Sequence, residues 1–410
     1  MRRAERLVVG GGIGGLTTAL ALAKRSMSCT VVERQTEFGE IGAGIQLAPN
    51  ALRVLDGLGV LHGVMANAVM PRRARLMNAR TGAVITALDF GEAFRARFGY
   101  PYIVTHRSDL LNAILSACRA SPLITLETSM AVLGLSAHDA SVRVRCENGC
   151  EWEAGVVIGA DGLRSTVRRY VLDDGEPDYV GHVAYRGTVP IDAAPGVVAR
   201  DEITWWVGPG MHLIQYPVRR GELLNQVFVF EADTVGDPDG WGPPEELGRF
   251  FGDKVPAVRE GAAVLDKDRR WILRDRPPDR NWTRGRATLL GDAAHPMVQY
   301  LAQGACQALE DAVVVAECLA LEDDVERGLA RYQAVRIPRA TATQMWGRTM
   351  GEIVHADGVT AMLRDALLRG REPTDFGYVE WLYQSAPQCL RLQAEGEAVH
   401  ARRSRAVQTD

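Results

Sequence analysis

The stretch Leu7-Val8-Val9-Gly10-Gly11-Gly12-Ile13-Gly14-Gly15-Leu16 joins a short apolar strand to a helical segment that runs to Lys24. A second apolar strand, Cys29-Thr30-Val31-Val32, ends at Glu33. Glycines at 10, 12 and 15 let the backbone turn tightly and approach a pyrophosphate at the helix N-terminus. Glu33 is placed to accept from an adenosine ribose hydroxyl, although a glycine turn without a ligand is the alternative. The residues expected to hold a dinucleotide are Gly10, Gly12, Ile13, Gly14, Gly15, Glu33 and Arg34.

The composition narrows the class of protein. The 410 residues are 47% hydrophobic and 24% charged, which predicts a globular protein of two joined domains. A net charge of −4 argues against a nucleic-acid or anionic membrane surface, and no apolar run is long enough to span a membrane. The seven cysteines form no Cys-x-x-Cys pair, so we expect reduced thiols, no metal site and a cytoplasmic location.

Two further buried strands, Val156 to Gly159 and Thr288 to Gly291, recur between sheet-rich segments. This alternation predicts an α/β fold in which a Rossmann-like domain is assembled from separated pieces, with an inserted mixed β-sheet and C-terminal helices. The expected dinucleotide-binding domain comprises residues 1–70, 100–177 and 278–350. Residues 71–99 and 178–277 are expected to form a substrate-binding sheet domain, and 351–410 a helical segment and tail.

Two more motifs accompany the glycine loop. Gly159-Ala160-Asp161-Gly162-Leu163-Arg164 follows the first of these strands, and Gly291-Asp292-Ala293-Ala294-His295-Pro296 follows the second. In order and spacing, the three motifs together resemble the single-component FAD-dependent aromatic hydroxylases, from residue 7 to about 350. This family uses FAD, a transiently bound NADH or NADPH, and O2. No second Gly-x-Gly-x-x-Gly joins a strand to a helix, which agrees with a nicotinamide cofactor that visits and leaves.

The resemblance assigns further FAD contacts. Asp292 would accept from the ribityl hydroxyls, although capping of the next helix is an equal alternative. Arg107 matches an arginine near the FAD, and its alternative is an ordinary residue of a first helical turn. The additional positions implied for FAD are Gly44, Gln46, Arg107, Asp161, Asp292, Gly304 and Ala305.

The substrate site is expected on the inserted sheet. In His212-Leu213-Ile214-Gln215-Tyr216, alternation places His212 and Tyr216 on one strand face. Together with Gln299-Tyr300-Leu301-Ala302-Gln303-Gly304, this strand resembles the 3-hydroxybenzoate 6-hydroxylase and salicylate hydroxylase branch. The alternatives are a satisfied histidine at 212 and a core aromatic at 216.

The implied reaction hydroxylates a phenolic benzoate through a flavin hydroperoxide. Neutral His212, with a pKa of about 6.5, would take the phenol proton, and Gln299 would orient the hydroxyl. Tyr216 would hydrogen-bond in the pocket, and Tyr102 and Arg186 are candidates for holding a carboxylate. Para hydroxylation of 3-hydroxybenzoate is favoured. The alternatives are decarboxylating hydroxylation of salicylate, another aromatic substrate, or a non-catalytic flavin protein. A homodimer formed through the apolar residues of the helices at 340–368 is expected, and the alternative is that these residues pack inward.

Overall fold

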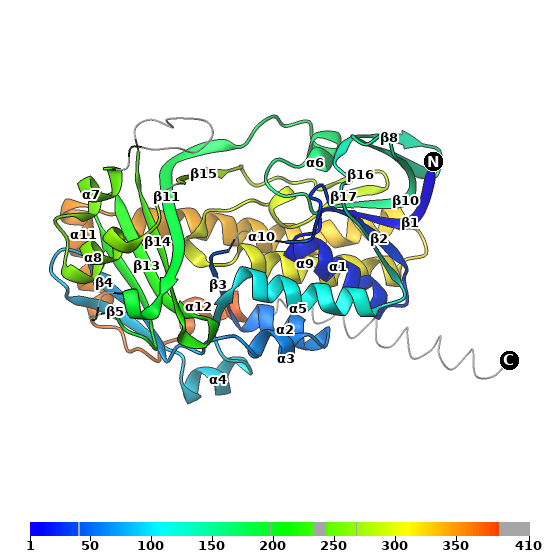
Figure 1. Cartoon of the computed structure of the whole chain (residues 1–410). Helices are drawn as coiled ribbons and strands as arrows, with labels where there is room; N and C mark the ends of the chain where they lie inside the picture. Colours follow the sequence, from blue (N-terminus) through cyan, green and yellow to red (C-terminus); the bar gives the residue numbers. More distant parts are fainter. Residues whose placement is uncertain are drawn as a thin grey trace.

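Two sheets lie at opposite ends of the molecule, and helices fill the space between and around them (Figure 1). The computed structural model describes residues 1–39, 42–194, 196, 198–232, 243, 245–267 and 269–384. Within these residues, none of the helices is long and apolar enough to cross a membrane. The long helix α10 (Val325–Val354) runs between the two ends (Figure 1).

The first sheet is a parallel sheet with an antiparallel extension. In the described residues it contains eight strands, and its main path follows the order β16-β17-β10-β1-β2-β7. The strands are β1 (Arg2–Val9), β2 (Cys29–Val32), β7 (Ile124–Glu127), β8 (Val132–His138), β9 (Ser141–Cys146), β10 (Glu151–Gly159), β16 (Thr283–Arg284) and β17 (Ala287–Leu289). Pairs β1–β2, β1–β10 and β10–β17 are all parallel, so four predicted buried strands meet in the order that a dinucleotide fold requires.

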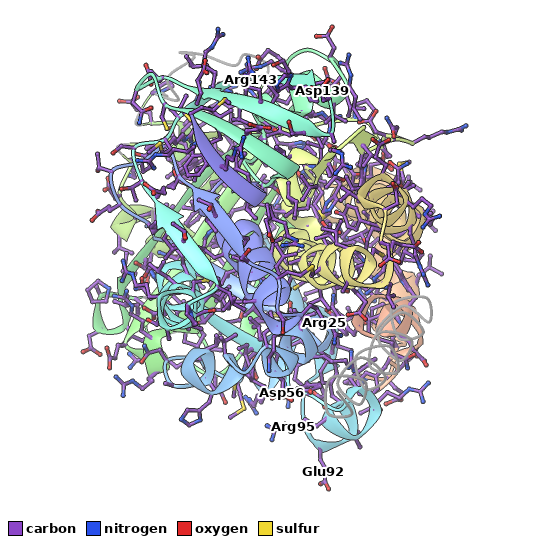
Figure 2. All side chains as sticks on the ribbon, turned by 90° about the vertical axis from the view of Figure 1, so that its right-hand side faces the viewer. Arg25, Asp56, Glu92, Arg95, Asp139 and Arg143 are labelled. Carbon is purple, nitrogen blue, oxygen red and sulfur yellow. The ribbon has the colours of Figure 1, made fainter. Side chains whose placement is uncertain are left out.

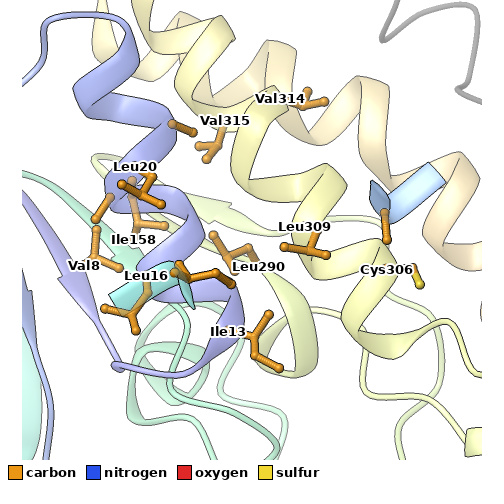
Figure 3. Close-up of a cluster of buried hydrophobic side chains, with 14 of the residues drawn as sticks. Val8, Ile13, Leu16, Leu20, Ile158, Leu290, Cys306, Leu309, Val314 and Val315 are labelled. Carbon is orange, nitrogen blue, oxygen red and sulfur yellow. The ribbon is translucent and has the colours of Figure 1, made fainter. Parts of the chain in front are cut away.

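Buried apolar side chains join this sheet to its helices. Ile13, Leu16 and Leu20 of α1 (Ile13–Lys24) lie in one buried cluster with Leu309 and Val315 of α9 (Gly304–Leu321), as Figure 3 shows. Besides α10, the other α-helices in the described residues are α2 (Pro49–Gly57), α3 (Leu61–Met65), α4 (Glu92–Phe98), α5 (Arg107–Ala120), α6 (Thr166–Val171), α7 (Glu246–Phe251), α8 (Pro256–Val264), α11 (Gly358–Arg369) and α12 (Gly377–Tyr383). Charged side chains such as Glu92, Arg95 and Asp139 lie at the periphery (Figure 2).

The second sheet is mixed and has the order β15-β11-β14-β13-β12-β4-β5 in the described residues. Its strands are β4 (Arg73–Asn78), β5 (Val84–Asp89), β11 (Asp178–Pro190), β12 (Ile203–Gly208), β13 (Met211–Val218), β14 (Leu223–Glu231) and β15 (Trp271–Asp275). Strands from two separated parts of the chain therefore share one sheet. The α/β fold with a Rossmann-like sheet, a separate mixed sheet and C-terminal helices is confirmed, whereas the domain boundaries remain a prediction.

Two segments differ from the sequence expectation. Residues 92–98 form helix α4 instead of continuing the strands, because Phe94 and Phe98 are four residues apart and share one helix face. Both rings pack against Phe376 and Tyr383 around α12, in the larger core cluster. The glycines between 39 and 50 indicate a loop before Asn50, but residues Gly44–Leu47 form strand β3, which pairs with β6 (Ile103–His106).

Candidate functional site

The glycine loop has the backbone that a pyrophosphate site requires. Gly10 adopts φ +109°, and a Cβ there would lie 2.3 Å from the carbonyl oxygen of Ala160. A Cβ on Gly15 would lie 1.9 Å from the carbonyl oxygen of Gly10. Helix α1 begins at Gly12 without a side-chain cap or an acidic residue in its first turn. Its free N–H groups and dipole can therefore receive an anion.

The residues predicted to bind the dinucleotide beside this loop differ in their hydrogen bonds and in their exposure. The Glu33 carboxylate accepts from the N–H of Gly11 at 2.7 Å and from the N–H of Gln35 at 2.9 Å, so it is fixed at the end of β2. Arg34 is exposed at the same edge. The side chain of Ile13 is buried in the core cluster (Figure 3), so only its backbone can face a ligand.

Asp161 is engaged locally. Its carboxylate accepts from the Ser165 hydroxyl and from the N–H groups of Thr166, at 2.7 Å, and Val167, at 3.2 Å. Burial raises the pKa of this carboxyl group, although these hydrogen bonds oppose the shift. The side chain therefore caps the start of α6, and the adjoining Ala160 carbonyl packs against Gly10. We infer that Asp161 positions the loop for FAD rather than offering it a free carboxylate.

Buried charged side chains hydrogen-bond to the segment that contains Asp292 and fix its conformation. Asp311 accepts from the N–H of Gly291 at 2.9 Å and from Nε2 of His295 at 2.6 Å. Arg168 donates to the carbonyls of Ala293 and Ala294 at 3.0 and 2.9 Å. Asp292 itself is exposed in the one-turn helix Gly291–Ala293. Its carboxylate is therefore presented toward the start of α9.

The N-terminus of helix α9, near Asp292, is a second position that favours an anion. The helix begins at Gly304 and Ala305 and has no side-chain cap. A Cβ on Gly304 would still be 4.0 Å from Oδ1 of Asp292, so the space there is open. The structure thus brings two predicted FAD segments, 291–293 and 304–305, to one place.

The substrate residues lie on one face of the second sheet. The β11–β14 and β14–β13 registers align Arg186 with Val227 and Ile214, so these three side chains point to the same side. His212 and Tyr216 share that face by alternation. Gln215 points the other way and bonds to Trp206 and Gln226. The predicted placement of His212 and Tyr216 on one face agrees with this geometry.

The β3–β6 ribbon closes over this face at Tyr216. A Cβ on Gly44 would lie 2.6 Å from Cε2 of Tyr216, so glycine allows the close approach of the ring. Gln46 accepts from the Tyr102 hydroxyl at 2.9 Å and also hydrogen-bonds to Tyr216. Burial raises the pKa of both phenols, so they remain protonated donors. Gly44, Gln46, Tyr102 and Tyr216 therefore form one contiguous group.

Two cations act on this group. Arg186 lies over the ring of Trp271, 4.1 Å from its centroid. The charges of Arg186 and Arg107 both oppose the rise in the pKa of Tyr216 that burial causes. Arg107 is the first residue of α5, and its N–H donates to the carbonyl of Ala43 at 3.0 Å. An anionic group on a substrate would meet positive potential here.

His212 is fully buried, and one of its ring nitrogens, Nε2, has no hydrogen-bond partner in the described residues. Nε2 of Gln299, the hydroxyl of Tyr300 and Nε1 of Trp205 are likewise buried without partners there. The rings of Tyr300 and Trp205 lie 5.4 and 5.8 Å from the ring of His212. Such a cluster indicates that a polar ligand belongs between these groups.

The expected pKa of His212 is wrong. Burial, together with His355 and His182, lowers it well below the usual value, because a charged imidazole would lose its hydration without gaining a carboxylate partner. His212 is therefore a neutral base throughout the physiological range. The partner of its Nδ1 is Nε2 of His355, at 2.7 Å.

Three residues of this cluster were not predicted from the sequence to have a functional role: His182, His355 and Tyr300. His355 lies 143 residues from His212, and His182 lies 173 residues from His355. No local pattern marks either histidine. Gly351 leaves room for Tyr300, since a Cβ there would lie 2.6 Å from its ring.

The donor set fits FAD. The glycine loop, two uncapped helix starts and the ordered Asp292 segment supply what a pyrophosphate, a ribityl chain and a flavin edge require. The buried face with His212 lies on the other sheet. A site that combines the FAD-binding segments with this buried polar face suits oxidation of a small polar aromatic molecule.

Comparisons with known proteins agree with this arrangement. The family model described as "FAD binding domain" matches residues 3–346. A 3-hydroxybenzoate 6-hydroxylase of Klebsiella oxytoca is 41% identical over 386 residues, covering 92% of this chain and 96% of that protein. A 3-amino-4-hydroxybenzoate 2-monooxygenase of Streptomyces platensis is 36% identical, with 93% and 96% covered. Crystalline Klebsiella pneumoniae HpxO, complexed with FAD and uric acid, superposes with a TM-score of 0.80 at 27% identity, with 96% and 97% covered.

The chain belongs to the FAD-binding flavoprotein monooxygenases and is an FAD-dependent aromatic monooxygenase. Its relatives include 3-hydroxybenzoate 6-hydroxylases at about 40% identity over 92% of the chain, with hydroxylases of other substrates nearby. The predicted family, enzyme class and FAD are thereby confirmed. The individual site residues remain predictions.

Proposed function

We propose that this enzyme is a 3-hydroxybenzoate 6-hydroxylase that uses NADH and O2 and forms 2,5-dihydroxybenzoate. The observation that carries the proposal is the fully buried His212, whose Nε2 has no partner among the described residues. Its ring lies 5.4 Å from that of Tyr300, which follows Gln299 in the chain, and the side chains of both neighbours also have unpaired buried atoms there. A phenol hydroxyl can donate to this nitrogen and accept from Gln299. The relatives named 3-hydroxybenzoate 6-hydroxylase support the choice of phenol.

In the proposed hydroxylation, the cofactor and each group of site residues have a separate role. Bound FAD, once reduced by the nicotinamide, supplies the activated oxygen. His212 removes the phenolic proton, which makes the ring a stronger nucleophile, and Gln299 orients the same oxygen. Tyr216 donates toward the carboxylate end of the substrate, Tyr102 fixes Gln46 beside it through its own hydroxyl, and Arg186 and Arg107 contribute positive potential there. The dry surroundings exclude water from the reacting atoms.

The test is NADH oxidation by the FAD-loaded protein with identification of the aromatic product. We expect 3-hydroxybenzoate to stimulate oxidation and to yield 2,5-dihydroxybenzoate, whereas benzoate, which lacks the phenol, should yield no hydroxylated product. Catechol and CO2 from salicylate would identify a decarboxylating hydroxylase instead. Product only from 3-amino-4-hydroxybenzoate would move the enzyme to that branch. Bound FAD without stimulation by any of these compounds would show that the enzyme hydroxylates another aromatic substrate.

We also propose a homodimer in the cytoplasm. Four apolar side chains on α11 have exposed fractions between 58% and 77%, and their spacing places them along one stripe: Val359, Met362, Leu363 and Leu367. A contiguous exposed apolar stripe favours an interface between copies. The six free cysteines of the described residues fit a reducing compartment.

Replacing Met362 and Leu367 by glutamate should abolish this dimer. Two charges on each copy would be desolvated in the interface, which opposes association. Light scattering should give twice 44.7 kDa for the wild type and 44.7 kDa for the double variant. Leu133→Glu is a matched control, because Leu133 is exposed on β8 of the first sheet. A wild-type monomer, or a dimer that survives the double substitution, contradicts the proposal.

A further inference from the structure

Three imidazoles form a continuous hydrogen-bonded row that starts in the buried site. Nδ1 of His212 lies 2.7 Å from Nε2 of His355, and Nδ1 of His355 lies 2.9 Å from Nε2 of His182. Nδ1 of His182 lies 3.0 Å from the carbonyl oxygen of Val180. The row therefore joins β13, the end of α10 and β11.

The Val180 carbonyl fixes the tautomer of all three rings. A carbonyl oxygen can only accept, so Nδ1 of His182 carries a hydrogen and its Nε2 is a lone pair. That lone pair accepts from Nδ1–H of His355, whose Nε2 then accepts from Nδ1–H of His212. Nε2 of His212, at the end of the row, must be a lone pair. This is the buried atom that has no partner in the described residues.

Along the row, the exposure of the side chains to solvent increases from His212 to His182. His212 is fully buried, whereas the side chain of His182 is 19% exposed and that of Glu231 is 61% exposed. Glu231 is the cross-strand partner of His182, and its Oε1 lies 4.0 Å from Nε2 of that ring. The hydroxyl-bearing ring of Tyr300 lies within 6.2 Å of all three imidazoles and shields them on one side.

The charges along the row favour a proton at its outer end. Burial lowers the pKa of all three histidines, that of His355 to about 3, so each ring is neutral at rest. Glu231 opposes this shift at His182, while His355 and His212 have only neighbouring imidazoles. A positive charge entering the row is therefore least unfavourable at His182, beside the carboxylate.

We propose that His212, His355 and His182 form a proton relay that carries the phenolic proton of the substrate out of the buried site to Glu231 and solvent. The relay rests on the proposed function, because it requires a substrate with an ionisable hydroxyl. His212 is the catalytic base, and His355 and His182 act through it.

The transfer balances at every atom. The phenolic O–H bond breaks, and an N–H bond forms at Nε2 of His212. The Nδ1 proton of His212 passes to Nε2 of His355, and the Nδ1 proton of His355 passes to Nε2 of His182. The phenolate is left in the site, and His182 carries the positive charge until its Nε2 proton passes to water or to Glu231. Reprotonation of the product hydroxyl moves the same protons back and restores the starting tautomers.

The resting tautomers are tested on the enzyme without an aromatic compound. We expect NMR of the protein labelled with 15N-histidine to show Nδ1–H and unprotonated Nε2 for His182, His212 and His355. Substitution of each histidine by glutamine assigns its signals. A ring of the three that carries its hydrogen on Nε2 overturns the relay. A stoichiometric divalent metal in the purified protein overturns it as well, because nitrogen and oxygen ligand atoms of His182, His355 and Glu231 lie within 4.8 Å of one another and the metal would occupy the lone pairs.

Proton movement is tested with His182→Ala, which leaves the buried end of the site intact. Binding of 3-hydroxybenzoate to the oxidised holoenzyme should release a proton, measured with an indicator dye, and produce a phenolate absorption band. In the variant we expect an unchanged Kd for the aromatic compound and phenolate formation slowed about 10- to 100-fold. Imidazole added to the buffer should restore the rate, since the vacated position reaches solvent. His138→Ala is the control and should behave as wild type, because this histidine lies on β8 of the first sheet and its side chain is 43% exposed.

The two possible failures are distinguishable. If wild-type enzyme does not bind 3-hydroxybenzoate, the proposed substrate is wrong, and the NMR tautomers still decide whether the row is built as a relay. If the wild type hydroxylates the compound but His182→Ala forms phenolate at the same rate, the relay is overturned and the function stands. Slowed phenolate formation without rescue by imidazole indicates a structural role for His182 and also overturns the relay.

Discussion

Replacing His212 by asparagine is expected to lower the rate of aromatic hydroxylation by about 10²- to 10⁴-fold, the usual contribution of a positioned general base. Asparagine preserves a polar, similarly shaped side chain but cannot take a proton. FAD should remain bound, because His212 lies on the second sheet and the glycine loop lies on the first. NADH oxidation should persist while product formation falls. The two rates are measured separately, by absorbance and by chromatography.

The dependence of the hydroxylation rate on pH also tests the role of His212 as a base. Because burial keeps the pKa of His212 far below 6.5, its neutral form persists as the pH falls through 6.5. The groups that face it are His355, which follows the last residue of α10, Tyr300 from the one-turn helix Gln299–Leu301, and, through His355, His182 with Glu231. Wild-type hydroxylation should therefore show no loss with a midpoint near 6.5. A midpoint there, or full hydroxylation by His212→Asn, contradicts His212 as a buried neutral base.

Replacing Arg336 by methionine is expected to destabilise the fold by about 3–5 kcal/mol, the cost of removing one partner from a buried ion pair. Arg336 is fully buried and donates to Asp311 and to Glu310, each at 2.6 Å. Burial alone would raise the pKa of Asp311, but the charges of His295 and Arg336 outweigh it and lower that pKa to about 2. Without Arg336, two buried carboxylates would retain fewer positive partners. Thermal unfolding followed by circular dichroism measures the loss.

Arg331→Met is the matched control on the same helix. Arg331 pairs with Glu322 at 3.2 Å, but both side chains are partly exposed, so the loss should be about 1 kcal/mol or less. Because Asp311 also holds Gly291 and His295, the Arg336 variant should lose FAD at a lower temperature than the wild type. Equal effects of the two substitutions would show that the buried network contributes no more than a surface pair.

The nucleotide half of the site could be predicted from the sequence because its signals are local. The turn at Gly10 to Gly15, the strand before it and the helix after it are contiguous, and their backbone requirements can be inferred from residue types alone. The one-face placement of His212 and Tyr216 is equally local, since it follows from strand alternation. The helix at 92–98 was missed because the two phenylalanines that make it amphipathic find their partners near residue 380.

What only the tertiary structure decided is the chemical state of these groups. The sequence determined that residue 212 is a histidine on a strand, but its pKa depends on burial and on two histidines contributed by β11 and the end of α10. In the same way, the carboxylate of Asp161 caps α6, and Tyr216 of β13 packs against Gly44 of β3. Backbone conformation is set by neighbours along the chain, whereas the protonation and availability of a side chain are set by whatever the fold places within a few ångströms of it.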